Sequence, residues 1–155
     1  IENIKEWDIT ERGIKYNTYR DHNIDIFTSD IDGSNTIRLT SARAVDYQPD
    51  WSSDGHWIVF SSLRYDNSEI FKIRTDGTDL ERLTSNEYND DQPAWSPNGN
   101  LIAFVSDRLG SKNIYVMDPD GTNQIQITSS LSGLNSPTWI KCKAGIHKKA
   151  GNTCP

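Results

Sequence analysis

The chain has 155 residues, of which 34% are hydrophobic and 25% are charged, as expected of a folded domain and not of a disordered chain. Since no apolar run approaches the roughly 18 residues of a membrane helix, we expect no membrane insertion. The net charge is −6 although residues 141–155 hold four lysines and no acid, so the body is strongly acidic, which argues against nucleic acid as a partner.

Short apolar runs follow one another along the chain in three similar groups. The first group has Trp7 and runs at 14–16, 24–27 and 38–40; the second has runs at 48–55, 57–62, 69–73 and 82–84; the third has runs at 91–99, 101–108, 113–121 and 125–128. The runs are rich in β-branched and aromatic residues and show no helical period, which predicts strands. A further starter strand is expected at 136–140.

The groups repeat with a period of 44 residues. The interval separates the members of four sets: Trp7, Trp51, Trp95 and Trp139; Gly33, Gly77 and Gly121; Phe27, Phe71 and Tyr115; Arg20, Arg64 and Arg108. A fixed period of this length is typical of repeat architectures, in which one unit cannot cover its own apolar face and neighbouring units stack.

Turn dipeptides divide each repeat into four strands. Asp54-Gly55 and Asn98-Gly99 separate the first and second strands, and three Asp-Gly pairs, at 32–33, 76–77 and 120–121, separate the third and fourth. Such pairs tolerate the positive φ of tight hairpins. Four antiparallel strands in 44 residues predict an all-β fold of β-propeller blades: three blades and one extra C-terminal strand over residues 1–140, then a basic tail at 141–155.

Three linked motifs resemble a known family. The segments at 92–99 (Gln-Pro-x-Trp-Ser-Pro-Asn-Gly), 104–108 (Phe-Val-Ser-Asp-Arg) and 114–122 (Ile-Tyr-Val-Met-Asp-x-Asp-Gly-Thr) look like TolB-like propeller repeats, which also occur in prolyl oligopeptidase-type and tricorn-type proteases. The resemblance covers about residues 4–140. It implies a scaffold for protein docking or, in the proteases, a gate before a separate catalytic domain.

The number of blades is too small for a closed ring. Propellers close with four to eight blades, and TolB-like rings, by the resemblance, have six. Three blades leave two apolar faces open, so we predict self-association into a ring or a filament, in which the Trp139 strand adds to a blade of the neighbouring copy. The alternative is that the chain, which begins at Ile1, is a processed or excised part of a longer ring.

The connections between the fourth strand of one blade and the first of the next carry the candidate binding residues. These are Asp46, Tyr47, Gln48, Asp90, Asp91, Gln92, Asn135 and Ser136. Converging carboxylates and amides at the channel end of a propeller suit a peptide, a cation or a sugar. The equally weighted alternative is structural: Gln48 and Gln92 precede prolines and serve to fix the chain there.

Other patterns have structural explanations. The Asp-x-Asp-Gly segments at 30–33 and 118–121 suggest calcium but lack the acid at position twelve of such loops, and hairpin turns account for them. The repeated arginines are expected to bond loop carbonyls or a nearby Asp in each blade. No Gly-x-Ser-x-Gly elbow, phosphate loop or histidine constellation is visible, so we expect no enzyme activity, no metal and no cofactor.

The two cysteines lie in the tail. Cys142 and Cys154 are expected to form a disulfide in an oxidising compartment, which predicts a secreted or periplasmic protein. The function expected is thus a non-catalytic, protein-binding or self-assembling TolB-like module. The alternatives are part of the propeller of a prolyl oligopeptidase-like hydrolase, or a lectin that uses Trp57 and the tyrosines.

Overall fold

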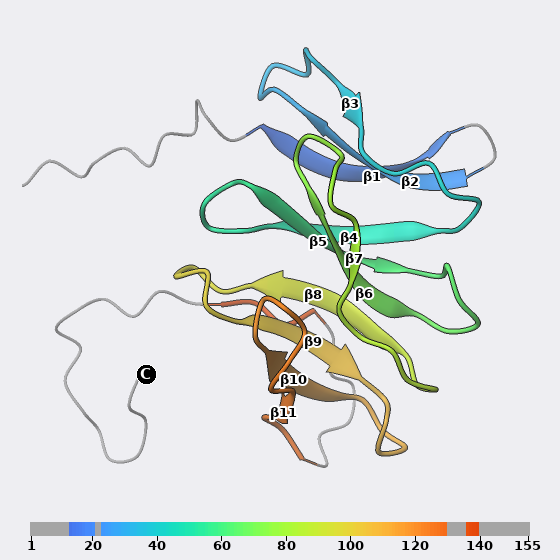
Figure 1. Ribbon diagram of the computed structural model, residues 1–155, viewed down its shortest axis with the longest axis vertical. Helices are drawn as coiled ribbons and strands as arrows, with labels where there is room; N and C mark the ends of the chain where they lie inside the picture. The colour runs from blue at the N-terminus through green and yellow to red at the C-terminus, as the bar shows by residue number, and fades with distance from the viewer. Residues whose placement is uncertain (1–12, 21–22, 130–135, 140–155) are drawn as a thin grey trace, which may run out of the picture.

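The computed structural model describes residues 13–20, 23–129 and 136–139, and its described part is all-β (Figure 1). The described residues form eleven strands and no helix, and therefore hold no helix that could span a membrane. The expected fold class is confirmed. Trp7, Asn135, Cys142 and Cys154 lie outside the described residues, so the disulfide stays a prediction.

The strands form three antiparallel sheets, which we call blades 1, 2 and 3, stacked in a row in Figure 1. Blade 1 has β1 (Ile14–Arg20), β2 (Asn23–Ser29) and β3 (Ile37–Arg38). Blade 2 has β4 (Asp46–Trp51), β5 (Trp57–Ser62), β6 (Glu69–Arg74) and β7 (Glu81–Arg82). Blade 3 has β8 (Asp90–Trp95), β9 (Ile102–Ser106), β10 (Asn113–Met117) and β11 (Ile125–Gln126).

The turn glycines take the backbone conformation that the dipeptides predict. Gly55 and Gly99 have φ of 75° and 78° between the first and second strands of their blades, and Gly121 has φ of 85° between the third and fourth. A Cβ at Gly121 would lie 2.5 Å from the carbonyl oxygen of Leu83 in blade 2. Glycine is therefore required there both for the turn and for the approach of the two blades.

Apolar side chains from successive blades interlock in two clusters. Between blades 1 and 2 lie Ile26, Leu39, Ile58, Phe60, Phe71 and Ile73, with Trp51 against them. Between blades 2 and 3 lie Val59, Ile70, Leu83, Trp95, Ile102, Phe104, Tyr115 and Met117, with Trp57 against them. Successive side chains of a strand point to opposite faces, so β5 sends Ile58 and Phe60 toward blade 1 and Val59 toward blade 3.

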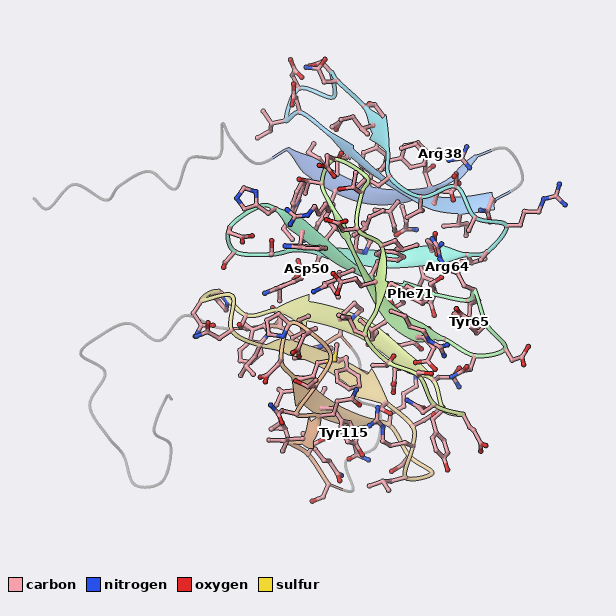
Figure 2. The ribbon with its side chains drawn as sticks, viewed as in Figure 1. Arg38, Asp50, Arg64, Tyr65, Phe71 and Tyr115 are labelled. Atoms are coloured by element: carbon pink, nitrogen blue, oxygen red, sulfur yellow. The ribbon has the colours of Figure 1, made fainter. Side chains whose placement is uncertain are left out.

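Two of the repeated arginines hold buried carboxylates. Arg64 Nη2 lies 2.6 Å from Asp46 Oδ2, and Arg108 Nη2 lies 2.9 Å from Asp90 Oδ2. Both aspartates are fully buried, and each pair ties the loop after the second strand to the first strand of its blade. The expected structural role is confirmed for Arg64 and Arg108 (Arg64 is labelled in Figure 2), and the side chain of Arg20 lies outside the described part.

Residues 136–139 differ from the expectation in one respect. They are described, but they form no strand. Instead the indole Nε1 of Trp139 donates a hydrogen bond of 2.9 Å to the carbonyl oxygen of Ala94 in β8. The first strand of a blade forms its backbone hydrogen bonds with the second strand of the same blade. No such second strand follows residues 136–139 in the described part of the chain, so the segment lies against blade 3 without pairing as a strand.

Candidate functional site

Six of the predicted binding residues lie in strands, not in the connecting loops where we expected them, while Ser136 forms no strand and Asn135 lies outside the described residues. Asp46, Tyr47 and Gln48 begin β4, and Asp90, Asp91 and Gln92 begin β8. The location predicted from sequence was wrong because the Gln-Pro pairs, read as loop, are β-bulges. The pairing of β4 with β5 shifts register between Tyr47 and Asp50, and that of β8 with β9 between Asp91 and Ala94, so the strands continue past the prolines.

The two aspartates that begin these strands are already bound. Asp46 accepts hydrogen bonds from Arg64 and from Ser62 Oγ, and Asp90 accepts them from Arg108 and from Asn86 Nδ2 at 2.7 Å. Since both carboxylates are fully buried, the structure separates them from the more exposed residues of the predicted set. Their role in it is to anchor loops.

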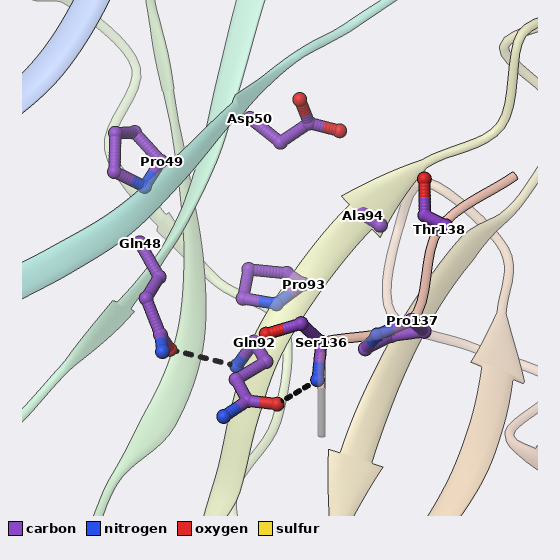
Figure 3. A pocket seen from close by; sticks show the side chains of 9 residues that line it. All are labelled: Gln48, Pro49, Asp50, Gln92, Pro93, Ala94, Ser136, Pro137 and Thr138. Carbon is purple, nitrogen blue, oxygen red and sulfur yellow. Dashed lines mark hydrogen bonds between the residues drawn. The ribbon is translucent and has the colours of Figure 1, made fainter. Parts of the chain in front are cut away.

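The glutamines join successive blades to one another. Gln48 and Gln92 have φ of 54° and 56°, a left-handed conformation at each bulge. Gln48 Oε1 accepts a hydrogen bond of 3.1 Å from the backbone N of Gln92, and Gln92 Oε1 accepts one from the backbone N of Ser136. Each glutamine side chain thus accepts a hydrogen bond from the backbone N–H of the residue 44 positions later (Figure 3). This arrangement favours the structural alternative for the two glutamines.

A pocket of about 230 Å³ lies between these segments (Figure 3). It is lined by Gln48, Pro49, Asp50, Gln92, Pro93, Ala94, Ser136, Pro137 and Thr138. Asp50 supplies its carboxylate, and this group already forms an ion pair with Lys15 of blade 1 and accepts a 2.7 Å hydrogen bond from the backbone N of Trp95 in blade 3. Asp50 was not among the residues predicted from the sequence, although its carboxylate joins three blades.

Tyr47 belongs to a second polar cluster between blades 2 and 3. Its hydroxyl donates a hydrogen bond of 2.5 Å to Asp91 Oδ1, and Ser68 Oγ donates one of 2.7 Å to the same oxygen. Burial and the neighbouring Asp91 raise the pKa of Tyr47 to about 12. The phenol therefore stays a hydrogen-bond donor over the whole neutral range.

Alkaline pH is expected to weaken the folded state through Tyr47. The pKa of Tyr47 is 10.0 in the unfolded chain and about 12 in the folded protein. Above pH 10 the unfolded chain therefore loses the phenol proton first, which favours unfolding. The contribution of Tyr47 to the free energy of unfolding is present below pH 10 and is lost between about pH 10 and 12. The urea midpoint of the parent should fall from pH 8 to pH 11, and the midpoint of Tyr47→Phe should fall by less over the same range. An equal fall in both proteins would contradict this assignment.

The other sequence patterns resolve into turn and surface packing. Asp120 Oδ1 accepts hydrogen bonds from the backbone N and Oγ1 of Thr122, which lower the pKa of Asp120. Trp57, the aromatic residue of the lectin alternative, carries Lys72 Nζ and the Arg74 guanidinium each 4.6 Å from its ring centroid. The Asp120 carboxylate thus stabilises a hairpin turn. The indole of Trp57 is already in cation–π contact with two basic side chains.

The two ends of the row of blades expose residues that are buried within it. Leu39 and Leu83 are each 7% exposed, whereas Ile127, 44 residues after Leu83, is 59% exposed. Likewise Ile58 and Ile102 are 0% exposed, whereas Ile14, 44 residues before Ile58, is 44% exposed. We call the blade 3 side that carries Ile127 the trailing face and the blade 1 side that carries Ile14 the leading face. The sequence shows only that both are apolar residues at repeated positions, and their exposure becomes visible once the blades are in place.

The fold is similar to those of solved propellers. A protein from Agrobacterium tumefaciens described as TolB is 34% identical with a TM-score of 0.70, over 77% of this chain and 46% of that one. TolB from Acinetobacter baumannii is 23% identical with a TM-score of 0.67, over 78% and 30%. A puromycin hydrolase is 15% identical with a TM-score of 0.68, over 83% and 22%, which shows the fold alone.

No protein-family model and no curated protein matches the sequence. The chain spans less than half the length of either TolB structure. The match to the Agrobacterium structure nevertheless covers 77% of this chain. The resemblance that the sequence motifs predict is thus confirmed, and the chain has the blade fold of a TolB-like β-propeller.

Proposed function

We propose that the chain is a non-catalytic, protein-binding module of the TolB-like propeller type, and that its principal partner is a second copy of itself. The observation that carries this proposal is Ile127, which is 59% exposed at a position where the equivalents Leu39 and Leu83 are 7% exposed. Burying such a side chain against a neighbouring blade contributes about 1.5–3 kcal/mol. A blade face that meets no neighbour forgoes this stabilisation.

The two end faces are of opposite and complementary kinds. At both interfaces inside the chain, a trailing face with Leu39 or Leu83 packs against a leading face with Ile58 or Ile102. The trailing face of blade 3 and the leading face of blade 1 are one of each kind. Blade 3 of one copy therefore fits blade 1 of another, and two copies give six blades, within the four to eight that close a ring.

The length of the similar structure supports the same stoichiometry. The chain covers 46% of the Agrobacterium protein, so a second copy would supply about the remaining half. The main rival is that the remaining blades belong to the same polypeptide, as in a hydrolase propeller. The likeness to the hydrolase rests on 15% identity and extends to the fold alone.

The proposal predicts that a charge at Ile127 prevents association. Ile127→Arg should give a single-chain mass by light scattering at concentrations where the parent chain gives twice that mass, because the interface would have to bury an unpaired guanidinium. Ile37→Arg is the matched control. Ile37 lies in the corresponding fourth-strand region of blade 1. It remains 50% exposed beside blade 2, so a charge at this position should not disturb an interface between blades.

Two results would count against the proposed function. A parent chain that is monomeric and soluble at all concentrations would remove self-association. Equal loss of association in the Ile37→Arg control would show that the effect is general destabilisation. We also propose a secreted or periplasmic location on the strength of the expected Cys142–Cys154 disulfide; free thiols in the native protein would contradict it.

A further inference from the structure

The segment Ser136–Trp139 repeats the opening of β4 and of β8. Its x-Pro-x-Trp pattern matches Gln48-Pro49-Asp50-Trp51 and Gln92-Pro93-Ala94-Trp95 at intervals of 44. The contacts match as well. The backbone N of Ser136 bonds Gln92 Oε1, as the backbone N of Gln92 bonds Gln48 Oε1, and Ser136 has the same left-handed backbone, with φ of 43°. The segment thus occupies the place of the first strand of a fourth blade.

What the segment lacks, within the described residues, is a second strand. β4 pairs with β5 and β8 pairs with β9, whereas residues 136–139 take part in no sheet. An extended segment with unpaired backbone donors and acceptors is a template for pairing with another strand.

A second strand without a described first strand lies at the other end of the row. β1 is the counterpart of β5 and β9, and it forms the edge of a sheet whose order is β1-β2-β3. In blades 2 and 3 the same edge carries β4 and β8. In Figure 1 blade 2 lies between β1 and blade 3, and Trp139 holds the segment at 136–139 against β8 of blade 3, so β1 and the segment are kept apart within one chain while the blades are stacked.

Building on the proposed self-association, we infer that Ser136–Trp139 is donated to a second copy, where it pairs antiparallel with β1 and completes blade 1 of that copy. The register follows from the chain's own repeats. Asp50 pairs with Val59 and Ala94 with Ala103, while Trp51 pairs with Ile58 and Trp95 with Ile102. A shift by 44 places Thr138 opposite Lys15 of the second copy, and Trp139 opposite its Ile14.

The competing occupant of this edge is the chain's own start. Trp7 has the correct period, but residues 4–6 read Ile-Lys-Glu and so lack the glutamine and the proline that precede the tryptophan in β4 and β8. Ser136–Trp139 retains the proline and makes the interblade contacts of a first strand. The donated segment is therefore the better match to the edge.

The register can be tested by disulfide trapping between two differently marked chains. In the 155-residue chain with Cys142→Ser and Cys154→Ser, one copy carries Thr138→Cys and the other Lys15→Cys. Residues directly opposed across antiparallel strands have Cα atoms about 4.5–5.5 Å apart, within the roughly 4.4–6.8 Å that a disulfide spans. After equal amounts are mixed and mildly oxidised, about half of the protein should migrate as a cross-linked heterodimer, the share that random pairing of the two chains gives. Asn17→Cys, two residues along β1, is the matched control and should cross-link at least tenfold less.

The outcomes separate the inference from the proposed function. A heterodimer trapped at Lys15 and not at Asn17 supports strand donation. A mixture that is dimeric by light scattering but untrapped overturns strand donation and leaves self-association intact, with the chain's own start or another segment on β1. A monomeric parent with no trapping overturns both. The chain with the two serine substitutions alone must have the mass of the parent.

Discussion

Replacing Phe104 by alanine is expected to lower the free energy of unfolding by about 3–5 kcal/mol. Phe104 is fully buried in the cluster between blades 2 and 3, and its ring stacks on Tyr115 with centroids 5.7 Å apart. The Arg108 guanidinium lies 5.6 Å from the Phe104 centroid and 4.5 Å from that of Tyr115. Truncation would remove these contacts and leave a cavity that β9, held by strands on both sides, cannot close.

The measurement is urea unfolding at a fixed protein concentration, because association adds to apparent stability. The urea midpoint of Phe104→Ala should fall strongly. The free energy of unfolding of Leu109→Ala should change by no more than about 0.5 kcal/mol. Leu109 is a large apolar residue of the same blade, but it is exposed. Similar small shifts in both variants would show that blades 2 and 3 do not share the core described above.

Replacing Asp90 by alanine is expected to cost about 3 kcal/mol or more. The carboxylate accepts hydrogen bonds of 2.9 and 3.1 Å from Arg108 Nη2 and one of 2.7 Å from Asn86 Nδ2. Removing it leaves a largely buried guanidinium without its counter-charge and an amide without its acceptor. The loss is large because the remaining partners stay desolvated, not because the ion pair itself is strongly stabilising.

Asp66→Ala is the control for the loss of a negative charge, since Asp66 is an exposed acid of the loop between β5 and β6. It should shift the unfolding free energy by about 0.5 kcal/mol or less. If Asp90→Ala and Asp66→Ala lowered the free energy of unfolding by similar amounts, the Asp90–Arg108 ion pair would have to be open to water. The buried position of the Asp90 carboxylate argues for a wide separation between the two variants.

The fold was predictable because several independent signals share one period. The tryptophans, turn glycines and paired aromatics recur every 44 residues, and each has a local physical role that the sequence displays. The Asp-Gly and Asn-Gly pairs required positive φ, and Gly55, Gly99 and Gly121 have it. Patterns of this kind depend on the backbone of a few adjacent residues, so they need no knowledge of neighbours.

The candidate site was less predictable because its roles depend on contacts between blades. Gln48 precedes a proline, a pattern typical of loops, and only the bulge with its partner strand shows that β4 runs through it. Nor does the sequence tell Ile127 from Leu83, because both are apolar residues at the same place in a repeat. They differ only in what lies beside them, which is a property of the assembly.

The central claim is that the leading face of blade 1 and the trailing face of blade 3 close against a second copy. The most direct test is the molar mass of the unmodified chain by light scattering over a range of concentrations. We expect a species of twice the 17.6 kDa chain mass that persists on dilution into the low micromolar range. A mass of 17.6 kDa throughout, with the blades folded, would contradict the account.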